Sequence, residues 1–547
     1  MKKFYLLVLL NGLFINIYAQ SFGWAKREGL WAYDYGYGIV NDNSGNVYVA
    51  GKYEEDADFS GTTLTCAGNH DIFLVRYSPT GTVDWIRTGG GSLGDYAHAL
   101  SIDASGNLLV AGEIEGYGNL ITFPGSSITL NSVGDNDVFL AKYNSSGDLL
   151  WAKSEGAYQS EKALGVASDP SGNIYICGYF TDTTRFNGVT YLSNGGHDVF
   201  LAKYDANGNF LWFKKAGGPG REEALNVKCD ASGNVYVCGM HSANAVFDTQ
   251  TLTAGSTSYP DLDIFLAKYD ASGNLLWVKS PGSDYDDVAW SMVVDNTGQI
   301  FITGEYNAYA VFDSYALTTT GNADVFVASY DASGNVLWVK SAGGPLVDRA
   351  RGLGTDGSNL YLTGQFGSTA MFGTNSVTAA DSSDVFIASI SNAGNFLWAT
   401  SVGGAPDSVE TLGYESGNAV TAESTGNVYA TGAVLDGGTF GTTSFTKYGR
   451  TDVFVAKLTA AGVGIAETAG QSDFTIYPNP SPGKFSIALN GKKVNDLAIY
   501  DQLGREIYTQ RELFSDETID LSAFGKGLYT VRLISGDRVM RREIIVE

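Results

Sequence analysis

One kind of segment recurs along most of the chain and constrains its fold more than any other feature: a strand-like run that begins with Asp. Seven copies begin at Asp71, Asp137, Asp198, Asp263, Asp324, Asp384 and Asp452. In the first six copies a Trp follows fourteen residues after the Asp, whereas the seventh copy has Ala466 there. The missing Trp stands near the N-terminus, as Trp24. We therefore expect the first strand to complete the last repeat and to close a ring without open sheet edges.

Each repeat spans roughly 60 to 68 residues and contains four strand-like runs, separated by turns rich in Gly, Asn and Asp. Four strands per repeat are typical of a β-propeller blade, and short runs that alternate with period two argue against a helical solenoid. We predict an all-β fold: a seven-bladed β-propeller over residues 20–462, closed by its N-terminal strand, followed by a small Ig-like β-sandwich.

Three sequence elements recur in these copies: Gly-Asn-Val-Tyr-Val-x-Gly, Asp-Val-Phe-Leu-Ala-Lys-Tyr and Leu-Trp-x-Lys-x-x-Gly-Gly. Together they resemble the bacterial β-propeller repeats known as SBBP, and the resemblance covers about residues 21–462. What it implies is architecture, because the biochemical role of the family is generally undefined.

The repeats stop near Gly462, and the small and polar residues 463–472 are predicted to form a linker. Three further strand-like blocks follow, at Phe474–Gly483 with its Tyr-Pro-Asn-Pro run, Ala498–Gly504 and Gly527–Arg532. These blocks resemble the type A C-terminal sorting domain of the type IX secretion system of Bacteroidota. The resemblance implies that residues 473–547 are a secretion and sorting domain that interacts with the secretion machinery and a sortase-like protease. It also implies a protein that is secreted or held at the outer cell surface.

The N-terminus has the pattern of a secretory signal peptide over residues 1–19. Lys2 and Lys3 precede the apolar run Phe4–Tyr18, and Ala19 offers a small residue at the cleavage point. We expect export through the periplasm after cleavage. No other segment is apolar enough over a sufficient length to cross a bilayer, so no transmembrane span is expected in the mature chain.

Charge and cysteine content narrow the classes of partner and of stabilising bond. The net charge of −25 argues against nucleic acid as a partner, because that affinity comes largely from Lys and Arg that neutralise phosphates. Four cysteines in 547 residues do not make a disulfide framework. We expect buried free thiols rather than bridges.

Most of the repeated residues have a structural interpretation. The Asp-Ala-Ser-Gly-Asn turns suit Asp side chains that bond the backbone, and the repeated Asp and Trp residues suit strand caps and fillers between blades. A Phe that recurs between the second and third strands suits core packing: Phe59, Phe123, Phe186, Phe247, Phe312, Phe372 and Phe440. The two remaining connections of each repeat differ in length and chemistry and emerge at one face, so we expect any ligand at that face.

A set of acidic residues at this face forms the main candidate site. Each stands near the start of the innermost strand of its blade: Asp34, Asp95, Glu161, Glu222, Asp287, Asp348 and Glu415. The seven are expected to encircle the channel mouth, where partial burial would require compensation. Two alternatives remain open: backbone N–H groups of the next blade, or a bound cation such as Ca²⁺. No other cofactor is expected.

Aromatic residues accompany the acids and complete the candidate ligand site: Tyr96, Tyr285 and Trp290, with Tyr35, Tyr158 and Tyr414 beside them. Exposed aromatic rings next to carboxylates suit the binding of sugars, whereas half-buried loop packing is the alternative. We therefore expect a binding or adhesion module for extracellular glycan or protein.

Catalysis has little support in the sequence. The four histidines are too scattered to indicate a triad or a His-rich metal site, and no catalytic residue is assigned. A hydrolase or lyase that uses channel-mouth acids such as Asp287 and Glu222 is one alternative. A structural surface scaffold without a discrete ligand is the other.

Overall fold

The computed structural model describes residues 20–242, 244–253, 262–380, 382–404, 415–435, 437–445, 450–459, 474–489, 494–501, 505–513, 516–535 and 538–546. The chain divides into two compact units, Met1–Ala460 and Ala461–Glu547. The predicted signal peptide, residues 1–19, and the predicted linker, residues 463–472, lie outside the described residues. Every described element is a strand, which confirms the all-β class.

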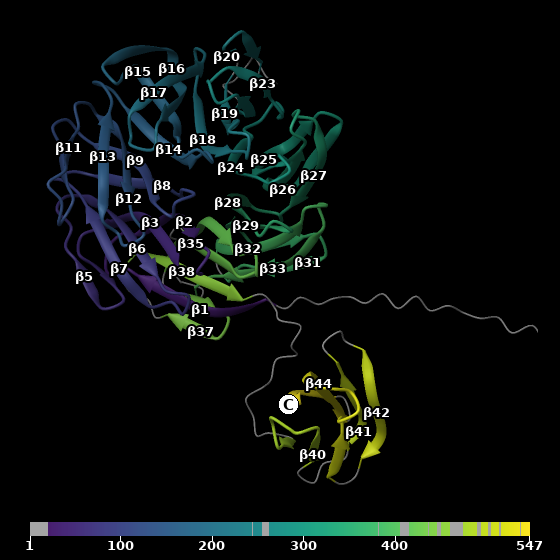
Figure 1. Ribbon diagram of the computed structural model, residues 1–547. Helices are drawn as coiled ribbons and strands as arrows, with labels where there is room; N and C mark the ends of the chain where they lie inside the picture. Colours follow the sequence, from purple (N-terminus) through teal and green to yellow (C-terminus); the bar gives the residue numbers. More distant parts are fainter. Residues whose placement is uncertain are drawn as a thin grey trace, which may run out of the picture. The chain divides into compact units, whose positions relative to one another are not determined.

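The larger unit, hereafter the ring unit, contains six antiparallel sheets of four strands and one of six, which arises because a hairpin of the following repeat pairs with its outer strand. The seven sheets are arranged side by side (Figure 1). Six of them follow the chain in order: β2(Tyr35–Asn41), β3(Val47–Glu54), β6(His70–Tyr77), β7(Val83–Gly89); β8(Asp95–Ile102), β9(Leu108–Glu115), β12(Asn136–Tyr143), β13(Leu149–Glu155); β14(Glu161–Ser168), β15(Ile174–Phe186), β16(Val189–Tyr204), β17(Phe210–Gly217); β18(Glu222–Cys229), β19(Val235–His241), β22(Asp263–Tyr269), β23(Leu275–Lys279); β24(Val288–Val294), β25(Ile300–Phe312), β26(Tyr315–Tyr330), β27(Val336–Ala342); β28(Arg349–Thr355), β29(Asn359–Phe366), β32(Asp384–Ser391), β33(Phe396–Val402).

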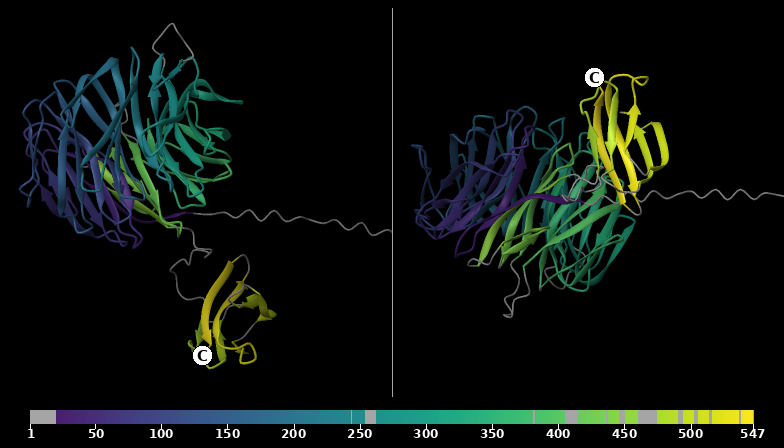
Figure 2. Two further views of the ribbon diagram at one scale, coloured as in Figure 1. Left: turned by 45° about the horizontal axis from the view of Figure 1, so that its top comes forward. Right: turned by 90° about the horizontal axis from the view of Figure 1, so that it is seen from below.

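The seventh sheet joins the two ends of the ring unit. Its strands are β34(Ser416–Ala422), β35(Val428–Leu435), β38(Thr451–Thr459) and, from the start of the chain, β1(Ser21–Glu28). The predicted closure is confirmed, because β1 pairs with β38 in antiparallel register. The first strands of neighbouring sheets contact one another in the cyclic order β2, β8, β14, β18, β24, β28, β34 and back to β2. Figure 2 shows these sheets around a common centre.

Small hairpins lie between the second and third strands of the sheets. They are β4(Ala57–Phe59) with β5(Thr62–Leu64), β10(Leu120–Thr122) with β11(Thr129–Asn131), β20(Ala245–Phe247) with β21(Gln250–Leu252), β30(Thr369–Phe372) with β31(Asn375–Thr378), and β36(Gly438–Phe440) with β37(Thr443–Phe445). In the third and fifth sheets the hairpin is continuous with the long strands β15 and β16, and β25 and β26. The repeated Phe residues of this region are all buried, at most 3% exposed, so their predicted packing role is confirmed.

The hydrophobic core lies between neighbouring sheets. One cluster, for example, joins Tyr48 and Leu74 of the first sheet to Leu108, Val110 and Phe139 of the second. The repeated Trp residues bridge the same junctions with their indole N–H groups. Five indole N–H groups donate to a backbone carbonyl of the adjacent sheet at 3.0 to 3.4 Å: Trp24 to Pro79 O, Trp85 to Ser145 O, Trp212 to Ala271 O, Trp277 to Ala332 O and Trp338 to Asn392 O.

The repeated Asp residues stabilise turns and strand starts, as predicted. In the first turn, Asp42 Oδ1 accepts the backbone N–H groups of Ser44 and Asn46 at 2.9 and 3.0 Å. At the start of β12, Asp137 Oδ2 accepts the N–H of Val133 at 2.7 Å. All four cysteines are free thiols, in line with expectation.

The smaller unit consists of two sheets. One contains β39(Thr475–Tyr477), β40(Lys484–Ala488) and β43(Glu517–Asp520), and the other contains β42(Glu506–Leu513), β41(Val494–Tyr500), β44(Gly527–Ser535) and β45(Arg538–Val546). A single core cluster contains residues of both sheets, among them Ile487, Ile519, Leu497 and Val531. The two sheets therefore pack face to face.

Candidate functional site

A β-bulge interrupts the first strand of each of the seven sheets at the same repeat position. In the first sheet, Gly36 pairs with Gly51 and Gly38 with Ala50, so Tyr37 has no partner in the ladder. The seven residues at this position, hereafter the bulge residues, are Tyr37, His98, Leu164, Leu225, Trp290, Arg351 and Asn418. A bulge redirects a side chain away from the regular alternation of a strand. Because the bulge recurs in every sheet, it is a regular feature of the repeat and not a local irregularity.

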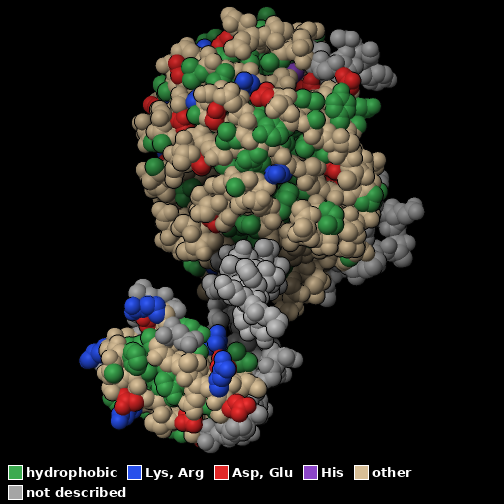
Figure 3. All heavy atoms as spheres, turned by 90° about the vertical axis from the view of Figure 1, so that its right-hand side faces the viewer, with side chains coloured by type: hydrophobic (Ala, Val, Ile, Leu, Met, Phe, Trp, Pro, Cys, Tyr) green, Lys and Arg blue, Asp and Glu red, His purple; other side chains and the backbone are tan. Residues whose placement is uncertain are grey.

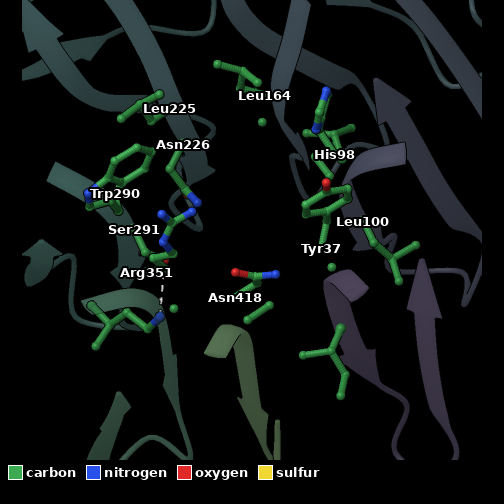
Figure 4. A pocket seen from close by; sticks show the side chains of 18 of the residues that line it. Tyr37, His98, Leu100, Leu164, Leu225, Asn226, Trp290, Ser291, Arg351 and Asn418 are labelled. Carbon is green, nitrogen blue, oxygen red and sulfur yellow. Dashed lines mark hydrogen bonds between the residues drawn. The ribbon is translucent and has the colours of Figure 1, made fainter. Parts of the chain in front are cut away.

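The bulge residues line a cavity of about 420 Å³ at the centre of the ring unit, hereafter the channel. Figure 4 shows all seven of them around it, each from a different sheet. A volume of this size lies within the usual range of small-molecule sites. The seven side chains differ in size, charge and polarity, so a sevenfold scaffold presents an asymmetric lining.

Small residues on both strands make room for the bulge. The residue before each bulge residue is always Gly or Ala, as in Gly36 and Ala97. The second strand places a Gly opposite: Gly51, Gly112, Gly178, Gly239, Gly304, Gly364 and Gly432. A Cβ at any of these glycines would lie 1.7 to 1.9 Å from a carbonyl oxygen of the first strand. The last Gly of the Gly-Asn-Val-Tyr-Val-x-Gly element is thus explained by the bulge it faces.

Aromatic rings form a continuous wall from the channel to the first and second sheets. Tyr37 stacks on Tyr35 with ring centroids 5.8 Å apart and contacts His98 at 5.4 Å. His98 stacks on Tyr96 at 5.5 Å. Lys52 Nζ lies 5.3 and 5.2 Å from the ring centroids of Tyr35 and Tyr96. Such a wall offers flat faces on which a planar or sugar ring can stack.

Two carboxylates near the channel are neutralised by cations. Glu113 accepts hydrogen bonds from Lys162 Nζ at 2.9 Å and pairs with His98 Nε2 at 3.1 Å. Burial alone would raise the pKa of Glu113, but His98 and Lys162 hold it below its ordinary value. Glu223 is bound in the same way by Arg221 at 2.6 Å and His197 at 2.7 Å.

A third cluster in the channel has unsatisfied polar atoms. The Arg351 guanidinium lies 5.2 Å from the ring centroid of Trp290. Arg351 Nε, Trp290 Nε1 and Asn226 Oδ1 are buried atoms without a hydrogen-bond partner among the described residues. A buried polar atom left unpaired costs about 1–3 kcal/mol, so their accumulation at one place requires an explanation.

The seven predicted acids do not face the channel, and that expectation is wrong. Asp34, Asp95, Glu161, Glu222, Asp287, Asp348 and Glu415 are at most 1% exposed, and none of them lines the cavity. The reason is the alternation of the strand: the acid lies three residues before the bulge residue and its side chain takes the opposite face.

Hydrogen bonds to the acids come from their own repeat rather than from the next blade, which corrects the second part of that expectation. Gly91 donates its N–H to Asp95 at 2.8 Å from the preceding connection. Glu54 donates to Asp34 at 3.0 Å from the end of the second strand of the same sheet. The acids therefore fasten the connection and the second strand of each repeat to the first strand.

Each acid also lies at a junction with the strand-leading Asp of the preceding sheet. At the ring closure, a Cβ on Gly29 would lie 2.4 Å from Asp34 Oδ2 and 2.4 Å from Asp452 Oδ1. Burial raises the pKa of Asp34 to about 7. At another junction, burial and the charge of Asp137 raise the pKa of Glu161 to about 9. These carboxyls hold protons well above the pH at which a free carboxyl loses one.

The predicted aromatic residues are dispersed. Trp290 lines the channel as a bulge residue, and Tyr96 belongs to the aromatic wall next to it. Tyr285 is 50% exposed and does not line the cavity. Tyr414 lies outside the described residues.

Sequence reasoning missed most of the channel residues, because it sought variation in the loops. The available signal was a position with six residue types in seven repeats, three residues after each acid and preceded by Gly or Ala. Arg351, Tyr37 and Asn418 occupy it without matching any motif. Within the described residues, no group of three or more His, Cys, Asp or Glu side chains is placed to hold a metal ion.

Comparison with known families identifies the smaller unit. Residues 475–547 match the model of the secretion system C-terminal sorting domain. This part of the chain is therefore similar to a sorting domain. The match indicates delivery by the type IX secretion system to the cell surface or the extracellular space. No helix in the part of the chain that the structure describes is long and apolar enough to cross a membrane.

The ring unit has distant relatives. An uncharacterised WD repeat-containing protein of Acanthamoeba polyphaga mimivirus is 23% identical over 473 residues, which cover 69% of this chain and 34% of the relative. The regulatory protein FlaEY of Caulobacter vibrioides is 27% identical over 193 residues, covering 34% of this chain and 20% of FlaEY. The chain thus spans about a third and a fifth of the length of these two curated relatives.

Among solved structures, the quinohemoprotein alcohol dehydrogenase of Comamonas testosteroni is similar at 10% identity with a TM-score of 0.36, over 85% of this chain and 79% of that one. A likeness this distant carries no inference about activity. The expectation that the chain is not an enzyme therefore stays a prediction.

Proposed function

We propose that this protein is an exported binding module that holds an extracellular glycan in the channel of a seven-bladed β-propeller. In this proposal, the seven sheets over residues 20–462 are the blades of an SBBP-type propeller, and residues 473–547 form an Ig-like sandwich. The sorting domain interacts with the type IX machinery and a sortase-like protease of a bacterium of the Bacteroidota. The observation that carries the proposal is the set of seven bulge residues, of six different types, around one cavity.

Differences among repeats support ligand recognition over a scaffold role. A scaffold needs only the shared residues, such as the junction Trp and the buried Phe. It does not require six different residue types among the seven bulge residues. Tyr37, His98 and Trp290 supply ring faces. Asn226 and Arg351 supply hydrogen-bonding atoms that have no partner within the described residues, and the combination is the composition of a sugar site.

The shape of the site favours a small ligand over a protein surface. A stable protein interface needs an accessible surface of about 800 Å² on each partner. The channel is instead a recessed cavity of about 420 Å³, a volume that suits a small ligand. Catalysis by Asp287 and Glu222 is not part of the proposal, because both side chains are fully buried.

The test is a glycan array probed with the purified full-length chain. A variant with Tyr37→Ala and Trp290→Ala removes two ring faces of the channel, and a control with Trp31→Ala and Tyr117→Ala removes two rings that are 64% and 76% exposed. We expect saturable binding of a subset of glycans that the channel variant loses and the control keeps. No retained glycan, or equal loss in both variants, would overturn the proposal.

A further inference from the structure

The charge of the channel is opposite to that of the protein as a whole. The chain carries a net charge of −25, and Figure 3 shows acidic side chains spread over one side of the ring unit with few basic ones among them. The channel, in contrast, is lined by four cationic side chains and one carboxylate: Lys162, Arg221, Lys228, Arg351 and Glu223. An acidic protein that gathers cations at one recess has the electrostatics of an anion site.

Two of these cations remain available after internal pairing. Glu113 pairs with Lys162, and Glu223 pairs with Arg221. Arg351 and Lys228 form no ion pair within the described residues: Glu305, the carboxylate whose charge acts on Arg351, is paired with Arg349. Burial lowers the pKa of both Arg351 and Lys228. A buried cation without a partner destabilises the folded state, and an anion bound from outside the protein would offset this destabilisation.

Unpaired hydrogen-bond donors lie beside the free guanidinium. Five other Trp residues donate their indole N–H to a carbonyl of the adjacent sheet, as Trp85 does to Ser145 O. Trp290 Nε1 and Arg351 Nε, both buried, donate to no described atom. The two atoms belong to residues whose cation and ring are in contact, with the guanidinium carbon 5.2 Å from the ring centroid.

The third unpaired atom is a hydrogen-bond acceptor, so its partner in a ligand must be a donor. Asn226 Oδ1 is buried without a donor, and Figure 4 shows Asn226 next to Arg351 and Trp290. A ligand that satisfies this cluster carries an anionic acceptor and, beside it, a hydroxyl that donates. Ring faces on Trp290 and Tyr37 complete the complement of a sugar.

We propose that the channel selects a hexuronate, a sugar unit that bears a carboxylate, and that Arg351 and the indole N–H of Trp290 hold that carboxylate. The inference rests on the proposed function and names the substrate class of the same site. A planar guanidinium holds the two oxygens of a carboxylate in a fork. It can hold a sulfate ester in the same way, so sulfated sugars are included as an outcome of the test. The carboxylate comes from a polysaccharide unit or from a free sugar acid.

Titration calorimetry of the full-length chain separates these cases. The probes are galacturonate, glucuronate and mannuronate disaccharides, the neutral disaccharides of the same linkages, sulfated neutral disaccharides and free galacturonate. We expect a uronate disaccharide to bind about tenfold or more tightly than its neutral counterpart, the ratio that one charge-assisted hydrogen bond supplies. Free galacturonate that binds as tightly as the disaccharide identifies a free sugar acid as the source.

Two variants locate the contact, and one control matches them. Arg351→Met keeps the length of the side chain but removes the charge, and Trp290→Phe keeps a ring but removes the N–H. Both are expected to abolish the preference for uronate, while Arg185→Met, at an arginine of the outer part of β15, keeps it.

The failures of the two proposals differ in outcome. Binding of neutral and uronate sugars with equal affinity, unchanged in Arg351→Met, overturns the carboxylate assignment and leaves glycan binding standing. Tighter binding of the sulfated sugars overturns it as well. Absence of binding by every probe, in a chain whose thermal unfolding is cooperative, overturns the uronate site, and an empty glycan array overturns the binding function itself.

Discussion

The carbonyl oxygen of Tyr96 lies 1.7 Å from the point where a Cβ on Gly112 would stand. This approach exists because the first strand bulges at His98, and it recurs in all seven sheets with the same pairing. One glycine thus connects the repeat motif, the local backbone and the side chain that enters the channel.

Replacing this glycine is expected to flatten the bulge. Gly112→Ala forces a backbone shift in β8 and costs about 3 kcal/mol, at the upper end of overpacking. Chemical denaturation measures the loss. Gly125→Asn is the control: its φ is 84°, nothing lies within 4 Å of its Cβ position, and Asn tolerates that conformation. Equal stability of Gly112→Ala and the parent chain would contradict the steric account.

The stability of the ring unit is expected to fall as pH rises. Burial raises the pKa of Asp95 to about 8, of Asp287 to about 8 and of Glu161 to about 9. Because these pKa values exceed those of the unfolded chain, the stabilisation is fully present below about pH 4 and is lost progressively as pH rises from there through the folded-state values of about 8 to 9. Calorimetry should show a Tm that falls from pH 5 to pH 9. A flat or rising Tm would contradict the assignment of protons to these carboxyls.

One isosteric variant tests that origin. Glu161→Gln places an amide N–H₂ near the buried Asp137 carboxyl, so the Tm at pH 8 should rise and its decline with pH should become less steep. Glu55→Gln, at an exposed position, should change neither. If Ca²⁺ rather than a proton stabilises the junctions, adding Ca²⁺ at pH 8 would raise the Tm of the parent chain by more than it raises that of Glu161→Gln, which keeps the other six acids.

The repeats made most of the fold predictable, because the pattern of each strand, turn and buried Phe occurs seven times in the sequence. The position of Trp24 near the N-terminus indicates that the first strand closes the ring. The bulges were not predictable in the same way. A bulge changes the phase of the alternation in β2 or β8 at a single residue, and strands of seven or eight residues are too short for that change to stand out in the sequence. The orientation of the acids was predicted wrongly for a related reason. The alternation in a sequence separates the two faces of a strand, but it does not show which side chains point into the channel, because that depends on how the sheets are arranged in the ring.

Ring closure by β1 is expected to dominate the stability of the last junction. Trp24 contacts the rings of Tyr77 and Tyr429 at 6.0 and 6.1 Å and donates to Pro79 O at 3.1 Å. Trp24→Ala should therefore cost about 3 kcal/mol by denaturation. Trp31→Ala, which removes a 64% exposed ring, should change stability by less than about 0.5 kcal/mol. Similar losses in both would contradict closure through Trp24.

Export is expected to depend on a folded sorting domain. Val531 is fully buried in the core shared by its two sheets, whereas Ile545 is 46% exposed. Val531→Asp should leave the protein inside the cell, and Ile545→Ser should reach the surface or the medium, as fractionation and immunoblotting would show. Normal export of Val531→Asp would contradict a role for the folded domain.

The central claim, that the channel is the binding site, is tested most directly by fluorine NMR of the full-length chain labelled with 5-fluorotryptophan. Trp290→Phe and Trp31→Phe assign the two resonances of interest, and the uronate and neutral disaccharides serve as titrants. The account predicts a saturable shift of the Trp290 resonance and an unmoved Trp31 resonance. A shift at Trp31 with Trp290 unmoved, or no shift at either, would contradict it.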